Sequence, residues 1–179
     1  MAASYLWRSS PHLRAMLRST RSVVATLSIA WCGLVLAQTD AVILRVTYAP
    51  ACDTAITLGS LQQLAQHHAT LKAHDGEEVT YAGALLWDVV GAACPSVVQE
   101  AKRQRIGMAV RIEAVDGYHA LVALMEADTS FREHPVLLCW EKNGVPLDAH
   151  DGPLQVIVAD DKRHARNVRM VSALRVVLP

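Results

Sequence analysis

Alternation of apolar and polar residues is the most regular pattern in this chain, and it predicts strands. In residues 107–114 the even-numbered positions are apolar, while Arg111 and Glu113 fall on the opposite face. A turn at Asp116-Gly117 would return the chain as an antiparallel strand through residues 118–124. The apolar face that this hairpin directs to a core consists of Met108, Val110, Ile112 and Ala114.

Two further hairpins are predicted from turn dipeptides. Residues 69–83 contain two strand segments that meet at Asp75-Gly76, and residues 135–147 contain two that meet at Asn143-Gly144. Single strands are expected over residues 41–48, 154–159 and 168–178.

Helical spacing of apolar residues is confined to two stretches. Residues 58–67 place leucines three apart, with Ser60 available as an N-cap. Residues 84–94 form a more apolar helix, which Pro95 would stop. Strands predominate and helices are short, so the predicted fold class is α+β and strand-rich.

The N-terminal 37 residues have the composition of a secretory signal peptide. Residues 1–21 carry four arginines and no acidic residue, and an apolar run follows over residues 22–37. Val35 and Ala37 occupy the −3 and −1 places of a small-residue cleavage site, as in Sec-type signals. The apolar run is short for a membrane span, which needs about 20 residues. We therefore expect a signal peptide over 1–37, a single domain over 38–179, and a periplasmic or secreted protein with no stable membrane span. The alternative is an uncleaved N-terminal anchor.

Removal of this segment changes the charge of the protein. Four of the 17 Lys and Arg residues lie in it, but none of the 17 Asp and Glu residues, so the remainder carries a net charge of about −4. A mildly acidic domain of this kind is not expected to bind nucleic acid.

Three cysteines remain in the predicted mature domain: Cys52, Cys94 and Cys139. Three cysteines allow at most one disulfide and leave one thiol, and their spacing matches no zinc motif. Because all three lie in or beside apolar stretches, the simplest interpretation is that they are buried small hydrophobic residues.

A cationic cluster follows the expected strand 154–159. Lys162, Arg163, Arg166 and Arg169 lie within eight residues, preceded by Asp160 and Asp161. The cluster is either an anion-binding loop or a solvated loop whose charge the two aspartates partly neutralise.

Four short markers occur in a characteristic order along the chain. They are Tyr81-x-Gly83-x-x-Leu86, Asp116-Gly117-Tyr118, Gly152-Pro153-Leu154, and the sequence ARNVR over 165–169. Taken together, residues 55–178 resemble the oxidoreductase molybdopterin-binding domain of the sulfite-oxidase fold, in its small exported stand-alone form. The resemblance implies a sulfite-oxidase-type molybdopterin-binding fold with a mixed sheet and short helices.

The same resemblance implies a cofactor site at the cationic cluster. Arg166 and Arg169 would bind the phosphate of molybdopterin, with Arg169 in place of the family's usual Lys. Lys162, Arg163 and Tyr118 would adjoin the same ligand, and a periplasmic redox protein would be the partner. Arg suits this role because its planar guanidinium donates two parallel hydrogen bonds to a phosphate.

One departure from the family concerns the metal. Catalytic members bind molybdenum through a cysteine about ten residues before the position of Tyr81, which falls near Leu71 here, and there is no cysteine over residues 53–93. We therefore assign no catalytic residue and no metal ligand. The alternative function is a cofactor-free periplasmic binding or interaction module that has kept the fold.

Other polar clusters have simpler interpretations. His67, His68 and His74 flank the position of the missing ligand, but adjacent residues on a strand point to opposite faces, so we expect exposed histidines. Residues 101–105 are expected to form a solvated basic connection, and Trp87 and Trp140 to belong to the core.

Overall fold

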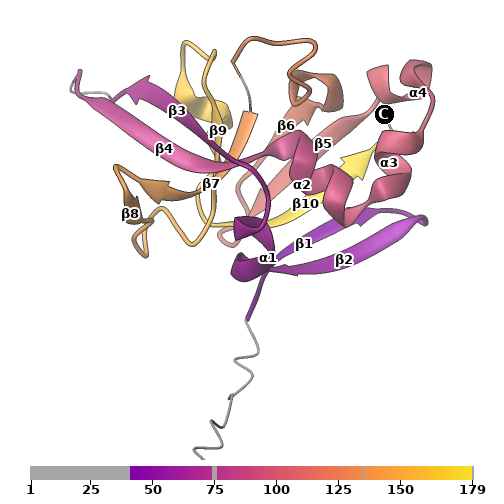
Figure 1. Ribbon diagram of the computed structural model, residues 1–179, viewed down its shortest axis with the longest axis horizontal. Coiled ribbons are helices and arrows are strands. Elements are labelled where there is room, and N and C mark those ends of the chain that lie inside the picture. The colour runs from indigo at the N-terminus through magenta and orange to yellow at the C-terminus, as the bar shows by residue number, and fades with distance from the viewer. Residues whose placement is uncertain (1–40, 74–75, 135, 179) are drawn as a thin grey trace, which may run out of the picture. The chain divides into compact units, whose positions relative to one another are not determined.

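The computed structural model describes residues 41–73, 76–134 and 136–178, which form two sheets and several short helices (Figure 1). The expected signal peptide, residues 1–37, lies outside the described residues. None of the helices described between residues 41 and 178 has the length and apolar character that a membrane crossing requires.

The first sheet is mixed. Its strands, in spatial order, are β2 (Cys52–Thr57), β1 (Val42–Tyr48), β10 (Val171–Val177), β5 (Ala109–Ala114) and β6 (His119–Ala123). The first and last strands of the domain, β1 and β10, are parallel, and the other neighbours are antiparallel. The last strand is therefore the central one, and it buries Val171, Leu174 and Val176.

The second sheet is antiparallel and strongly apolar. Its strands are β3 (Gln66–Lys72), β4 (Glu78–Leu85), β7 (Val136–Lys142) and β8 (Val145–Pro146), with β9 (Gln155–Val158) also paired to β7. Both faces of β7 and β9 are buried. Leu138 and Val156 belong to the main core, whereas Leu137 and Ile157 belong to a smaller apolar cluster with Cys139.

The helices are α1 (Leu58–Gln62), α2 (Leu86–Ala93), α3 (Pro95–Gln99) and α4 (Lys102–Ile106), with 3-10 turns η1 (Leu124–Glu126) and η2 (His164–Arg166). Helix α2 lies between the two sheets (Figure 1) and contacts β2, β4 and β7. Its buried residues Leu86, Val89 and Val90 join both sheets into the main core.

The three predicted hairpins are present. The turn between β7 and β8 has positive φ at both Asn143 (52°) and Gly144 (76°), as a type I′ turn requires. Gly117 (88°) and Gly76 (89°) also have positive φ, while Asp75 lies outside the described residues. These turns form as predicted because their residues tolerate the left-handed backbone.

The helix predicted over 58–67 is wrong in its extent. It ends at Gln62, because the chain from Gln66 onward pairs with β4 as strand β3. Ser60 is not its N-cap: Thr57 is, since its hydroxyl accepts the N–H of Ser60 at 3.2 Å.

Three other boundaries also differ from prediction. The second helix ends at Ala93, and Pro95 begins α3 at a position where its missing N–H costs nothing. Residues 101–105 are solvent-exposed except for the partly buried Arg105, as predicted, but residues 102–106 form helix α4, and Arg105 lies over the ring of Trp87. Strand β10 begins at Val171, three residues later than expected, because the preceding residues join the two sheets.

Cys94 and Cys139 are fully buried, as expected, Cys52 is partly buried, and Cys139 keeps a free thiol. Cys52 and Cys94 form a disulfide that links β2 to the end of α2. Thr54 reinforces the same contact by donating its hydroxyl to the carbonyl of Ala93 at 2.8 Å. Cys52 and Cys94 are 42 residues apart in the sequence, so the sequence alone did not indicate that they are close in the fold.

We predict that replacement of both disulfide cysteines, Cys52→Ser with Cys94→Ser, lowers the free energy of unfolding by about 2–4 kcal/mol, because the crosslink restricts the unfolded chain. Urea unfolding of the oxidised wild type and the variant measures the difference. Reductant should destabilise the wild type and leave the variant unchanged. Equal midpoints for the oxidised and reduced wild type would contradict the prediction.

Candidate functional site

Residues 167–171, the bridging segment, connect the two sheets through their backbone. On one side, the N–H groups of Met170 and Val171 donate to the carbonyls of Asp151 (3.1 Å) and Leu154 (2.9 Å). On the other side, Val115 at the end of β5 donates its N–H to the carbonyl of Met170 at 3.0 Å. The bridging segment is therefore held from both sheets.

Met170 has a left-handed backbone, with φ of 50°, which is uncommon for a residue other than Gly, Asn or Asp. Both its N–H and its carbonyl are hydrogen-bonded, so the surrounding structure holds it in this conformation. Such local strain is found preferentially at functional sites, and here it lies directly beside Arg169.

A cavity of about 390 Å³ opens beside the bridging segment. The hydroxyl of Tyr118 donates to the carbonyl of Ala165, which attaches the β5–β6 hairpin to η2. Arg169, whose side chain is 50% exposed, is the cation of this cavity. The lining residues are Asp116, Tyr118, His150, His164, Ala165, Asn167, Arg169 and Met170.

A second cavity, of about 250 Å³, shares three of these residues, His164, Asn167 and Arg169. It is also lined by Tyr81, Lys142, Asp151 and Gln155. We call the two cavities together the Arg169 groove.

Asp151 is the buried carboxylate of the groove. It accepts hydrogen bonds from Lys142 Nζ at 3.1 Å and Arg169 Nη1 at 3.4 Å, and its Oδ1 lies 3.0 Å from His150 Nδ1. Burial by itself raises the pKa of Asp151, but the hydrogen bonds from Lys142, His150 and Arg169 and the charge of Lys142 together hold the pKa below its usual value. Asp151 is therefore ionised and fixes Lys142 and Arg169 at the groove.

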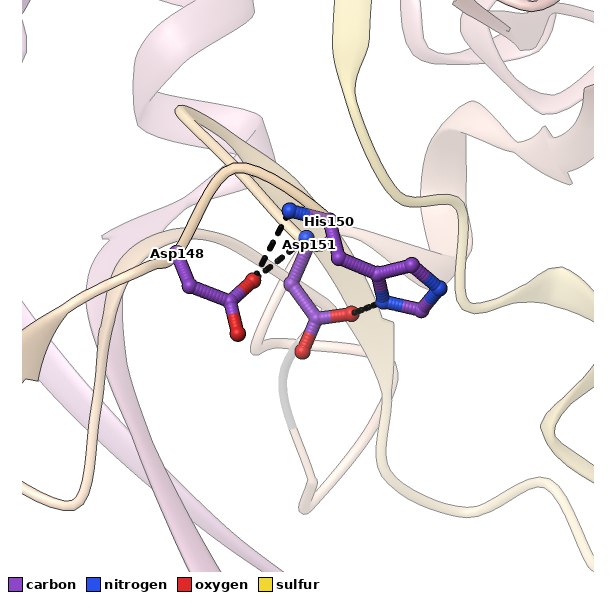
Figure 2. Close-up of side chains that lie close together, drawn as sticks. All are labelled: Asp148, His150 and Asp151. Carbon is purple, nitrogen blue, oxygen red and sulfur yellow. Dashed lines mark hydrogen bonds and ion pairs between the residues drawn. The ribbon is translucent and has the colours of Figure 1, made fainter.

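Asp148, His150 and Asp151 lie close together (Figure 2), with potential metal-ligating atoms within 4.8 Å of one another. Asp148 Oδ1 accepts the backbone N–H groups of His150 and Asp151 at 2.9 Å each, so it already has a structural role in this turn. Two cations, Lys142 and Arg169, contact Asp151 and would repel a metal ion. We therefore assign no metal to this group.

Arg166 lies in a different environment from Arg169. Its Nε and Nη2 donate to Asp161 at 2.8 and 2.6 Å, and its Nη1 donates to Glu126 at 3.2 Å. Arg132 extends this network by bonding Glu126 at 2.7 Å and Asp160 at 2.8 Å. The guanidinium of Arg166 is thus engaged by carboxylates, and its role as a phosphate ligand stays a prediction.

The remaining predicted cations, Lys162 and Arg163, are exposed and are not among the residues that line the groove. Tyr118 does line it, as described above. The cationic cluster therefore divides in three dimensions: Arg169 lies in the groove, Arg166 in an ion-pair network, and the other two at the surface.

The described residues do not fit a thiolate-bound molybdenum. Leu71, near the expected ligand position, is a buried residue of β3 within the smaller apolar cluster and has no donor atom. Cys52 and Cys94 are joined to each other. Cys139 is fully buried, and burial raises the pKa of its thiol far above its usual value, so it stays protonated.

The histidines of β3 are separated as expected for neighbours on a strand: His68 is exposed and His67 is partly buried. His74 lies outside the described residues. The histidines that do line the groove, His150 and His164, were not singled out from the sequence, nor were Lys142, Gln155 and Asn167. Asn167 lies within the ARNVR marker, and His150, Gln155 and His164 each lie within two residues of a marker, so only Lys142 had no signal nearby.

Comparison with known proteins supports the fold but identifies no close relative. No protein-family model matches the chain, and no curated protein does either. The structure is similar to the crystal structure of the sulfane dehydrogenase SoxCD from Paracoccus pantotrophus, with a TM-score of 0.58 and 14% sequence identity. The similarity covers 76% of this chain and 38% of that chain, so this protein corresponds to less than two-fifths of the length of the matched chain.

This similarity confirms the predicted fold class: a strand-rich α+β fold of the sulfite-oxidase type, with a mixed sheet and short helices. At 14% identity it supports the fold alone.

We predict that Asp161→Asn destabilises the protein at pH 7 by about 1–2 kcal/mol, since it removes two charge-assisted hydrogen bonds to Arg166. The hydrogen bonds from Arg166 hold the pKa of Asp161 below its usual value. The stabilisation that Asp161 provides is therefore complete when the pH is above the pKa of this residue in the unfolded chain. It is lost as the pH falls through the pKa of Asp161 in the folded protein.

Urea unfolding between pH 7 and pH 3 measures this effect. The wild type should lose stability toward acid, and Asp161→Asn should lose less over the same range. Glu133→Gln, at an exposed position, is the control and should follow the wild type. A variant with the same acid dependence as the wild type would show that this ion pair does not contribute.

We also predict that Cys139 resists alkylation in the folded protein, because its thiol is buried and protonated. Iodoacetamide should modify it only in denaturant, as measured by peptide mass spectrometry. Rapid labelling under native conditions would contradict the inaccessibility of this thiol.

Proposed function

We propose that this protein is an exported binding domain that holds a phosphorylated, molybdopterin-type anionic ligand in the Arg169 groove, without a cysteine-ligated molybdenum. The observation that carries the proposal is the half-exposed guanidinium of Arg169 on a bridging segment fixed from both sheets.

Arg169 is suited to bind a phosphate. Among its contacts with described residues it uses Nη1, toward Asp151 and the ring of His150, which leaves Nε and Nη2 as donors. His164 lines the same cavity and can donate a ring N–H, whereas the Nδ1–H of His150 is directed to Asp151. A phosphate monoester is recognised by several convergent donors of this kind.

The other cations support the site indirectly. Arg166 holds η2 in place through Asp161 and Glu126, and Lys142 shares Asp151 with Arg169. Lys162 and Arg163 are exposed outside the groove lining, so we expect little contribution from them. We infer that Arg166 is a positioning residue and that Arg169 contacts the ligand.

When molybdopterin carries its metal it supplies redox chemistry, but the described residues offer no thiolate to hold that metal in the usual way. We therefore propose binding and assign no catalytic step. A periplasmic redox protein as partner follows from the family resemblance alone.

Export is supported by two independent features. Residues 1–37 have the charge and apolar pattern of a signal peptide, and Cys52 and Cys94 form a disulfide of the kind that persists in oxidising compartments. A periplasmic or secreted location accounts for both.

A second candidate function is a cofactor-free binding or interaction module. It is favoured by the ion pairs of Arg166, which neutralise one of the two arginines expected to bind phosphate. In this case the groove would bind no pterin.

Arg169→Ala is predicted to weaken binding of inorganic phosphate by roughly 10- to 100-fold, about 1.4–3 kcal/mol, because it removes charge-assisted donors from the groove. Isothermal titration calorimetry at low salt measures this. Arg163→Ala, in the same cluster but outside the groove lining, is the matched control and should change affinity less than twofold. Arg166→Ala should lower stability more than Arg169→Ala does.

The protein should also be isolated from the periplasm of molybdenum-replete cells and examined for oxidised-pterin fluorescence and for metal. Pterin fluorescence that Arg169→Ala abolishes supports the proposal. If Arg169→Ala leaves the affinity for phosphate unchanged, the site assigned to phosphate is wrong. Phosphate binding without any pterin, even after reconstitution, favours the cofactor-free module.

A further inference from the structure

Gln155 is a buried polar residue without an evident structural role. It lies on β9, is 6% exposed, and its side-chain oxygen Oε1 has no hydrogen-bond partner among the described residues. Buried polar groups are nearly always paired, and an unpaired one destabilises the fold. An unpaired amide oxygen at this position therefore needs an explanation.

The surroundings of Gln155 would accept an apolar residue. Successive strand residues alternate between faces, so Gln155 shares its face with Ile157, which is fully buried in the smaller apolar cluster. Its register partner on β7 is Cys139, also fully buried. Leucine would suit this environment better than glutamine, so packing alone does not explain the amide.

Neighbouring polar groups do not need the amide either. The carboxylate of Asp151 is already bonded to Lys142 and Arg169 and lies against His150. The side-chain oxygen of Asn167 accepts the backbone N–H of Val158 at 2.8 Å. Gln155 thus lines the second cavity of the Arg169 groove, and rotation of its side-chain amide would present Oε1, which is enclosed and unpaired, to a donor bound there.

We propose that the cavity at Gln155 is a second subsite, which binds a hydrogen-bond donor, N–H or O–H, on the organic part of the ligand whose phosphate lies at Arg169. This inference rests on the proposed function. The two cavities share His164, Asn167 and Arg169, so one ligand can extend from the first into the second.

The subsite defines the class of ligand. It is a phosphate monoester whose organic part carries an N–H or O–H donor, because Gln155 Oε1 can only accept. A site built to hydrogen-bond a polar group discriminates against an analogue that lacks that group, since its own buried atom is then left unpaired. Gln155 is therefore a specificity-determining residue, whereas Arg169 supplies affinity for any phosphate.

The test compares three probes: methyl phosphate, which has no donor on its organic part, ribose 5-phosphate, which has O–H donors, and guanosine 5′-monophosphate, which also has N–H donors. Affinities for the wild type and Gln155→Leu are measured by calorimetry on the full chain. At least one donor-bearing probe should bind the wild type fivefold or more tightly than methyl phosphate. Which of the two binds more tightly identifies the type of donor.

In Gln155→Leu this advantage should fall below twofold, while the affinity for methyl phosphate stays unchanged. The thermal midpoint should stay the same or rise, because an unpaired buried amide has been removed. Gln155→Met is a second apolar variant in case Leu does not fold, and Gln104→Leu, at an exposed position on α4, is the matched control.

The outcomes separate the two proposals. If methyl phosphate does not bind the wild type, the proposed function fails and this inference fails with it. If methyl phosphate binds but the three affinities are equal, or if Gln155→Leu keeps the advantage, only the subsite is wrong. A large loss of stability in both apolar variants would show a structural role for the amide and would also overturn the subsite.

Discussion

The backbone hydrogen bonds of the bridging segment are the constraint on which the site depends. Residues 167–171 bond to β9 and the preceding loop on one side and to the end of β5 on the other, immediately before the chain enters the centre of the first sheet as β10. Because both sheets fix this segment, Met170 is held in a left-handed conformation and Arg169 is placed at the groove. A change in how the two sheets pack would displace Arg169 relative to His150 and Lys142.

Electrostatic pairing then divides the cationic loop into parts with different roles. Asp161 and Glu126 engage Arg166 and attach η2 to η1, while Asp151 contacts Arg169 by a longer bond and leaves it half exposed. Two arginines three residues apart thus differ in what they can bind. Asp161, Glu126 and Asp151 partly neutralise the positive charge of the loop and also hold the loop in place. The solvated-loop interpretation therefore applies to Lys162 and Arg163, and the ligand-binding interpretation applies to Arg169.

Local sequence patterns predicted the hairpins well because the turn residues and the strand alternation indicate the same structure. Gly117 and Asn143-Gly144 adopt the positive φ that their turns need, and the even-numbered residues of β5 are buried. Where a local preference competed with pairing, pairing prevailed: the helix that begins at Leu58 gives way to β3 within a few residues. The disulfide between Cys52 and Cys94 could not be predicted, since apolar surroundings are equally typical of a buried thiol.

The sequence by itself determined the strand-rich fold class, the strands along the chain other than β2, which was not predicted, and a cationic loop after β9. Alternation, turn dipeptides and family markers are local signals, and they can be read without knowing which strands pair. Only the tertiary structure decided that β10 lies between β1 and β5, that Arg169 rather than Arg166 faces the groove, and that Gln155 lies unpaired beside it. The reason is physical: which donors and acceptors meet depends on contacts between residues far apart in the chain, whereas propensity depends only on neighbours.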